Sequence, residues 1–338
     1  MNAYIDLPNL RSYAKQGGHQ CFMACTDMLR QNFNLCFTFK KESIQHEKKQ
    51  SMASIMNLMK MLTANRGNSE SFQWDTLYPE RPLKDDVYDT MSKEQLMSVY
   101  LLDDPNIQAM VSHGYLLFAA EGEEIKTLSN LLIEDRVIPS KPFLIRDMAD
   151  WSVIANNASP CTDIIIVDPY LFAQSEFLYE KNAYKIIEHL GQFNKQLPLN
   201  VVIFTFNEYL DMIDGKKVRK PILFQSILRS IKSKLKEISD VEHNVTFVVM
   251  PVTKVKEHDR YIITNYKMFN PGNSFTFFND KGQNISTGRF FNVYTHGDKD
   301  MRELSLSTIS DLQHLVDEVK GGLNTIIGDK KSRFLTFD

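Results

Sequence analysis

The sequence predicts an α/β protein. A mainly helical N-terminal region is expected in residues 1–160, and a layered, mostly parallel sheet with helices on both faces in residues 161–338. Before residue 160, apolar residues recur mostly at helical spacing. After it, apolar runs of strand length alternate with helical patterns, and such uninterrupted runs are typical of strands covered on both faces. The length of 338 residues suits two domains.

Three helices are predicted in the N-terminal region, over residues 12–33, 51–65 and 92–102. In the first two, apolar residues recur three and four positions apart, which places them on one face of a helix. The third segment begins with Ser92 and carries Gln95 three positions later, the pattern of a capping box.

In the C-terminal region, strands are predicted at residues 164–167, 199–206 and 244–250, and a β-hairpin from residues 260–269 and 274–280. Helices are predicted at residues 183–193, 220–238 and 308–322. Because helices separate the three strands, a parallel sheet is expected.

Composition narrows the classes of protein. Hydrophobic residues at 43% and charged residues at 24% are ordinary globular values, so a sizeable core is expected. A net charge of −3 argues against a coat of basic residues for bulk nucleic-acid binding. Four cysteines are few for a disulfide framework and fit a reducing, cytoplasmic setting. No signal peptide and no apolar run of roughly 18 residues is found, so no membrane association is expected.

The segment KEHDRYIITN, residues 256–265, carries the main functional hypothesis. On a strand, residues two apart point to the same face, so His258 and Arg260 are expected to project together. An imidazole can attack phosphorus or shuttle a proton, and a guanidinium can hold two phosphate oxygens. This pair therefore indicates a site for a phosphate group.

This segment resembles the motif of the phospholipase D-like superfamily, which carries His-x-Lys and, four residues later, Asp. His258 matches the histidine, Arg260 stands at the lysine position and Asn265 at the aspartate position. Ser274, in Gly-Asn-Ser, echoes a later Gly-Ser element of the family. The resemblance covers residues 160–338 and implies His258, Arg260 and Asn265 as the catalytic positions.

In that family two motifs face each other, one histidine acting as nucleophile and the other as general acid. Since this chain has one motif, the resemblance implies a homodimer for catalysis. Two of the three signature positions are replaced, and Lys→Arg is not conservative at a site that holds one phosphate oxygen. Binding or sensing of phosphate, with catalysis weak or absent, is therefore expected first.

A basic segment supports a nucleic-acid partner. Its cations are Lys216, Lys217, Arg219, Lys220, Arg229, Lys232, Lys234 and Lys236. In a chain of net negative charge, such a cluster could follow a nucleic-acid backbone. An alternative is a solvated helix face that balances acidic stretches elsewhere. Asp168, Asn207 and Glu208 follow two predicted strands and are the expected polar companions of His258, because ligands gather at the carboxyl ends of parallel strands.

Two alternatives concern the N-terminal region. Residues 16–29 resemble the opening helix of papain-like peptidases, with Cys21 as nucleophile, Gln16 as oxyanion residue and His113 as the downstream histidine. A zinc site is the other alternative, from His19, Cys21, Cys25 and Cys36. Their spacing matches no common zinc motif, and no Gly-rich phosphate loop is found. No metal or cofactor is therefore expected.

The preferred hypothesis is a cytoplasmic, homo-oligomeric protein that binds or senses nucleic acid or another phosphate-bearing ligand through a degenerate phospholipase D-like domain. The analogy of fold indicates an antiviral defence system of bacteria. One alternative is a metal-independent phosphodiesterase or nuclease, a homodimer acting through His258. Another is a structural subunit whose basic helix meets an acidic protein partner.

Overall fold

The computed structural model describes residues 1–64, 72–76, 98–103, 121–129, 143–157, 159–172, 178–192, 198–251, 260–287, 290–323 and 325–338. The chain divides into two compact units, residues 1–140 with 295–303, and residues 141–294 with 304–338. The boundary expected at residue 160 falls inside the second unit. Residues before it contribute to that unit, because Trp151 lies in its core and residues 143–144 pair with its sheet.

The first unit contains a parallel sheet of four short strands in the order β3-β2-β1-β4. The strands are β1 (Asn2–Ile5), β2 (Asn34–Phe37), β3 (Phe72–Gln73) and β4 (Val99–Leu101). The longest has four residues, too few for a clear strand pattern in the sequence. The expectation of a mainly helical region therefore missed this sheet, and residues 99–101 of the predicted third helix form β4 instead.

The helices of the first unit agree better with the sequence. They are α1 (Leu7–Lys15), α2 (Phe22–Asn32), α3 (Lys49–Thr63) and α6 (Glu124–Leu128), with the 3₁₀ helix η1 (Lys41–His46). Helix α1 begins after Asp6, whose carboxylate accepts a hydrogen bond from the Asn9 N–H and caps the helix. The segment predicted as one helix over residues 12–33 is two helices, separated at Gly17 and Gly18, and α3 confirms the second prediction.

The second unit is built on an eight-stranded sheet in the order β14-β10-β7-β6-β11-β12-β13-β5. Its strands are β5 (Phe143–Leu144), β6 (Asp163–Val167), β7 (Asn200–Phe206), β10 (Asn244–Met250), β11 (Tyr261–Thr264), β12 (Lys267–Asn270), β13 (Phe290–Thr295) and β14 (Ile326–Gly328). Every residue of β6, β7 and β10 is buried, which confirms the three strands predicted from apolar runs.

The sheet is mixed, and the expectation of a mostly parallel sheet is corrected. Only β6, β7 and β10 run parallel to one another, whereas β14 and β11 flank them antiparallel, and β12 and β5 continue with antiparallel pairs. The reason lies in the connections. Helices separate the three parallel strands, but only two residues separate β11 from β12, and a turn of that length can join only antiparallel strands. The hairpin thus lies within residues 261–270, and residues 274–280 do not form its second strand.

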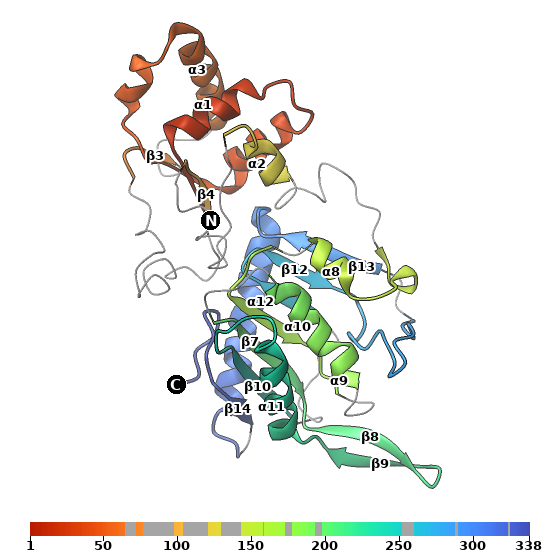
Figure 1. The fold of residues 1–338 in the computed structure, drawn as a ribbon. Helices are drawn as coiled ribbons and strands as arrows, with labels where there is room; N and C mark the ends of the chain where they lie inside the picture. Colours follow the sequence, from red (N-terminus) through yellow and green to blue (C-terminus); the bar gives the residue numbers. More distant parts are fainter. Residues whose placement is uncertain are drawn as a thin grey trace. The chain divides into compact units, whose positions relative to one another are not determined.

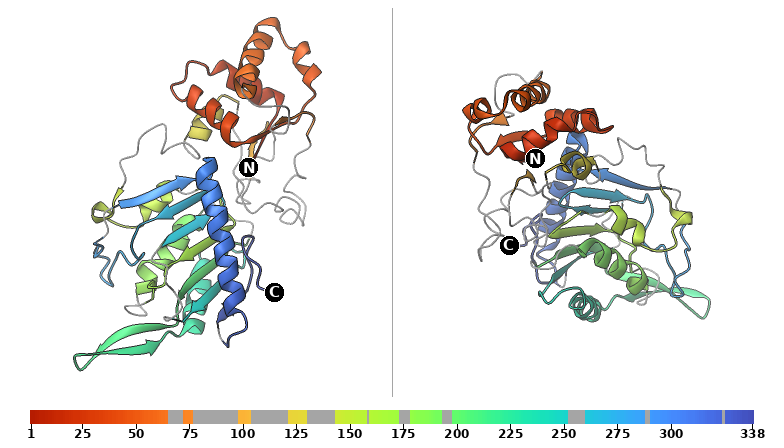
Figure 2. Two further views of the ribbon diagram at one scale, coloured as in Figure 1. Left: turned by 180° about the vertical axis from the view of Figure 1, so that it is seen from behind. Right: turned by 45° about the horizontal axis from the view of Figure 1, so that its top comes forward.

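Helices cover both faces of the sheet (Figure 1, Figure 2). α10 (Ala183–Gly191) and α11 (Phe224–Leu235) pack on one face, where α8 (Ser152–Asn157) and α9 (Leu178–Lys181) also lie, and α12 (Lys299–Val319) crosses the other. Helix α11 starts later than predicted, because residues 216–221 form a strand. Within the described part of the chain, no helix is both long and apolar enough to span a bilayer.

A two-stranded ribbon extends from the body of the second unit (Figure 1). It consists of β8 (Glu208–Ile213) and β9 (Lys216–Pro221), an antiparallel pair separate from the eight-stranded sheet. Asp214 and Gly215 form the turn with positive φ values of 52° and 74°. This geometry is that of a two-residue hairpin loop, for which Asp-Gly is a favoured sequence.

Candidate functional site at the carboxyl edge of the sheet

The register of β11 against β6 places the motif residue Arg260 at the carboxyl end of β6. Tyr261, the first residue of β11, lies opposite Val167, the last residue of β6. Arg260 and Asp168, one residue further along each strand, therefore meet at the same edge of the sheet. The chain passes from β6 to β7 on one side and later reaches β11 on the other, so the strand order reverses at this point. Such reversals at carboxyl ends are where open α/β sheets bind ligands.

Asp168 is the central acid of this edge and is fully buried. One carboxylate oxygen, Oδ2, accepts hydrogen bonds from the Ser274 hydroxyl at 2.6 Å and the Phe275 N–H at 2.7 Å. The other, Oδ1, accepts from the Tyr170 N–H at 2.9 Å. Burial raises the pKa of Asp168 to about 6, although these hydrogen bonds and the Arg260 charge oppose the rise. The carboxyl group thus titrates near neutral pH in a polar site.

Arg260 is held against an aromatic surface. Its guanidinium carbon lies 5.1 Å from the centre of the Tyr170 ring, within the range of a cation–π contact. The Tyr170 side chain is 41% exposed, and its ring meets that of Phe206 edge-on at 5.2 Å. A stacked guanidinium keeps its plane fixed, which suits two-point binding of a phosphate group. The edge therefore offers one oriented cation beside an exposed aromatic ring.

The other motif residues lie apart from this edge or outside the described residues. His258 belongs to residues 252–259, which the structure does not describe, so the expected His258–Arg260 pair stays a prediction. Asn265 is buried at the opposite, amino edge of the sheet. Its side-chain oxygen accepts hydrogen bonds from the backbone N–H groups of Thr162 at 2.8 Å and Asp163 at 3.1 Å. Asn265 thus stabilises the entry to β6 and does not join Arg260.

Ser274 is brought to the edge, but its hydroxyl donates to Asp168 and accepts from the Thr276 hydroxyl at 3.1 Å. Its immediate role is to hold Asp168. The expected companions Asn207 and Glu208 also lie at this edge, since Asn207 follows β7 and Glu208 begins the ribbon. Arg260, Asp168, Ser274 and Asn207 are therefore gathered at one edge, as the carboxyl-end argument predicted for Asp168, Asn207 and Glu208.

The basic segment is divided between two elements. Lys216, Lys217, Arg219 and Lys220 lie on β9 of the ribbon, and Arg229, Lys232 and Lys234 lie on α11, with Lys236 directly after it. On the ribbon, Lys216 and Arg219 are exposed. Three acids, Glu208, Asp211 and Asp214, belong to the same hairpin. The expected continuous positive face is thus two separate groups of cations.

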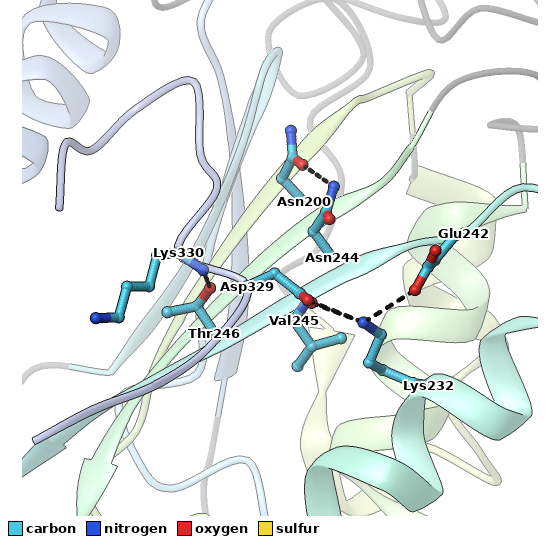
Figure 3. A network of polar contacts seen from close by, with 8 residues as sticks. All are labelled: Asn200, Lys232, Glu242, Asn244, Val245, Thr246, Asp329 and Lys330. Carbon is cyan, nitrogen blue, oxygen red and sulfur yellow. Dashed lines mark hydrogen bonds and ion pairs between the residues drawn. The ribbon is translucent and has the colours of Figure 1, made fainter. Parts of the chain in front are cut away.

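The two inner cations of α11 are engaged within the protein. Lys232 donates to both carboxylate oxygens of Asp329, at 2.9 and 3.0 Å, and lies 3.5 Å from Glu242 (Figure 3). Lys234 pairs with Glu180 at 3.0 Å and lies over the Tyr184 ring. Since Asp329 also accepts from the Val245 N–H, Lys232 helps to fix the C-terminal segment against β10. These two lysines are poor candidates for binding a phosphate.

The N-terminal alternatives gain little from the structure. All four cysteines are buried, and burial raises the pKa of the Cys25 thiol to about 12. The side-chain amide of Gln16 donates to Glu124 and is thereby engaged, while His113 lies outside the described residues. No group of three or more His, Cys, Asp or Glu side chains in the described ranges is arranged to hold a metal ion.

One feature of this edge was missed by the sequence. A cavity of about 500 Å³ opens between the carboxyl ends of β7 and β10, the start of α11 and β14. Its lining comes from four separate parts of the chain, so no local motif could have revealed it. Comparison with protein-family models, with curated proteins and with solved structures gives no match to this chain.

Proposed function

We propose that the second unit binds nucleic acid through its phosphate groups at the carboxyl edge of the sheet, without cleaving it. The observation that carries the proposal is the placement of Arg260, whose guanidinium is stacked on the exposed Tyr170 ring beside the buried Asp168. Arg260 contacts a phosphate, and Tyr170 offers an aromatic face to an adjoining base. Bases stack on such rings in proteins that bind single strands.

The exposed cations of the ribbon supply longer-range attraction. Lys216 and Arg219 project from an element that extends away from the body of the second unit. Each phosphate neutralised by such a cation releases condensed counterions, so binding weakens as salt rises. The acids of the same hairpin limit this attraction. The ribbon therefore assists binding at the edge, and Arg260 remains the main contact.

The phospholipase D-like resemblance enters this proposal as a phosphate-binding ancestry. The absence of catalysis is proposed for two reasons. Arg260 replaces the motif lysine, and the side chain at the motif aspartate position, Asn265, already accepts two backbone hydrogen bonds at the far edge of the sheet. A working enzyme of the family also pairs two histidines, which here requires His258 from each of two copies.

The test is binding of labelled 20-nucleotide single strands and duplexes of DNA and RNA, followed by fluorescence anisotropy at two salt concentrations. Arg260→Ala is expected to weaken binding of every probe about tenfold, as loss of one phosphate contact implies. Arg260→Lys should recover part of the affinity. The matched control is Arg146→Ala, which removes an exposed arginine elsewhere in the same unit. Equal affinities for Arg260→Ala and the unsubstituted protein would refute the proposal.

Cleavage is measured on the same probes in EDTA. Intact probes support a binding protein. Metal-independent cleavage that disappears in His258→Ala would overturn the non-catalytic part of the proposal in favour of a phosphodiesterase.

A further inference from the structure

We propose that the cavity beside Asn207 receives an unpaired nucleobase, so that the ligand of the second unit is single-stranded nucleic acid. This inference rests on the function proposed above and assigns its substrate class. The cavity measures about 500 Å³, within the range of protein sites for small molecules. A nucleobase is a flat, largely apolar ring with polar atoms on its edge, and the cavity has to match both properties.

The walls of the cavity are mostly apolar. Ile222 and Phe224 come from the segment that leads into α11, Val249 from β10, and Ile327 from β14. Two leucines at the cavity are unusually exposed, Leu223 at 59% and Leu323 at 94%. Exposed leucines beside an apolar hollow favour a ligand that covers them. A stacked base would do so with its flat faces.

Asn207 supplies the polar recognition. Its backbone is fixed from both sides, because its N–H donates to the Met250 carbonyl at 3.2 Å and its carbonyl accepts from the Ile222 N–H at 3.0 Å. Its side-chain oxygen is buried and accepts no hydrogen bond from the protein. Such an oxygen is costly unless a donor reaches it. A base in the cavity satisfies the carboxamide after rotation about χ2, a torsion with a broad energy profile.

A carboxamide matches the edge of a base chemically, since it carries an acceptor and donors side by side. Asparagine pairs in this way with adenine in known base contacts. Gln225 and Thr325 line the same cavity and add further donors and acceptors. In a duplex, the bases are stacked and paired inside the helix. Only an unpaired base can therefore enter a cavity between sheet and helix.

The cavity and Arg260 are close enough to serve one strand. β7 is separated from β11 by β6 alone, which places their ends about 10 Å apart, two strand spacings. Successive nucleotides of a stacked strand are about 3.4 Å apart, so this distance corresponds to roughly three nucleotides. The Tyr170 and Phe206 rings lie between the two positions, because Phe206 precedes Asn207 in the chain. Arg260, the ring pair and the cavity thus form one continuous track.

The closing experiment uses a single strand that contains one 2-aminopurine, a fluorescent base that brightens or dims as its stacking changes, and the matching duplex. The unsubstituted protein is expected to bind the single strand at least tenfold more tightly than the duplex and to change the fluorescence of the analogue. Asn207→Leu, which is close in volume and removes no hydrogen bond of the described protein, should abolish the fluorescence change and weaken single-strand binding about tenfold. Its affinity for the duplex should not change.

Asn57→Leu, an exposed asparagine in the first unit, is the matched control and should behave as the unsubstituted protein. Thermal unfolding of Asn207→Leu establishes that the variant is folded. The inference fails if Arg260→Ala weakens both probes while single strand and duplex bind equally and Asn207→Leu has no effect. If neither probe binds the unsubstituted protein, the proposed function itself fails, and the inference falls with it.

Discussion

The hydroxyl of Ser274 donates a hydrogen bond of 2.6 Å to the carboxylate of Asp168, across 106 residues of the chain. This contact ties the segment after β12 to the carboxyl end of β6. It explains why an Asp-Pro sequence after a strand, which alone indicates only a turn, is part of a site. A buried acid that accepts hydrogen bonds from two distant residues and one neighbour is more constrained than a turn requires.

Asp168 is expected to make the stability of the second unit depend on pH between about 4 and 6. Its folded pKa of about 6 lies above the ordinary 3.8, so in this window the folded protein binds more protons than the unfolded chain. The free energy of unfolding therefore falls as pH rises through the window. Asp168→Asn, a neutral isostere of the protonated acid, removes this dependence.

Denaturant unfolding at pH 4, 5, 6 and 7 measures the effect. The difference in unfolding free energy between Asp168→Asn and the unsubstituted protein should grow by on the order of 3 kcal/mol in favour of the variant from pH 4 to 7. Asp150→Asn is the control, because Asp150 is exposed and its pKa is lowered by hydrogen bonds with Ser152. A constant difference across this range would contradict the shifted pKa of Asp168.

Ser274→Ala is expected to destabilise the protein by about 1.5–3 kcal/mol at pH 7, where Asp168 is mostly ionised, since hydrogen bonds to charged groups contribute that much. Because a bond that favours the charged form is lost, the pKa of Asp168 should rise further. The cost should therefore shrink towards pH 4. Urea titrations at both pH values give these numbers, with the exposed Ser310→Ala as control. A cost that does not depend on pH would mean that the hydroxyl acts through packing.

The strands β6, β7 and β10 were predictable, because each is a continuous apolar run that no helix period explains. The antiparallel flanks were harder. The hairpin β11–β12 turns within Asn265 and Tyr266, and the same run of residues could equally be one strand. The ribbon β8–β9 was missed although Asp214-Gly215 is a strong hairpin signal, because the lysines after it suggested a helix or loop.

For the site, the sequence indicated which residues meet but not what they do. The carboxyl-end rule gathered Asp168, Asn207 and Glu208 because it depends only on strand direction. Ser274 was selected as a phosphate ligand, and its bond to Asp168 depends on the path of residues 271–278, which has no regular period. Asn265 shows the opposite case, since its motif position suggested chemistry whereas its contacts are structural.

Asn265→Asp restores the acid of the family motif and is expected to destabilise the protein without creating cleavage. The new carboxylate would lie at hydrogen-bond distance from the backbone of Asp163, a buried acid whose pKa is already raised by burial. Two buried carboxylates so close cannot both ionise cheaply. We expect a loss of about 2–4 kcal/mol at pH 7 that is largely recovered near pH 4.

Unfolding curves at the two pH values, together with the cleavage assay in EDTA, check this expectation. Asn284→Asp is not a suitable control, because the Asn284 amide donates to two backbone carbonyls. Asn57→Asp is suitable, since Asn57 is exposed. If Asn265→Asp were as stable as the unsubstituted protein and gained nuclease activity, Asn265 would belong to a catalytic motif after all.

Charge reversal should separate the two groups of basic residues. Lys232→Glu places a carboxylate against Asp329 and Glu242, so it is expected to lower the unfolding free energy by about 1–3 kcal/mol. The double variant Lys216→Glu, Arg219→Glu changes two exposed ribbon residues and should leave stability within about 0.5 kcal/mol. It should instead weaken nucleic-acid binding and reduce the slope of log affinity against log salt by up to about 1.4 for single strands, 0.7 per lost phosphate contact.

The readouts are thermal unfolding and anisotropy titrations between 50 and 200 mM salt. The two variants are each other's controls, since one changes a lysine that is bonded within the protein and the other changes side chains that face solvent. A ribbon variant with unchanged salt slope would restrict binding to the edge of the sheet. Because Lys232 is bonded to the C-terminal segment, loss of binding in Lys232→Glu at unchanged stability would place a phosphate contact on α11, where the structure provides only engaged inner lysines.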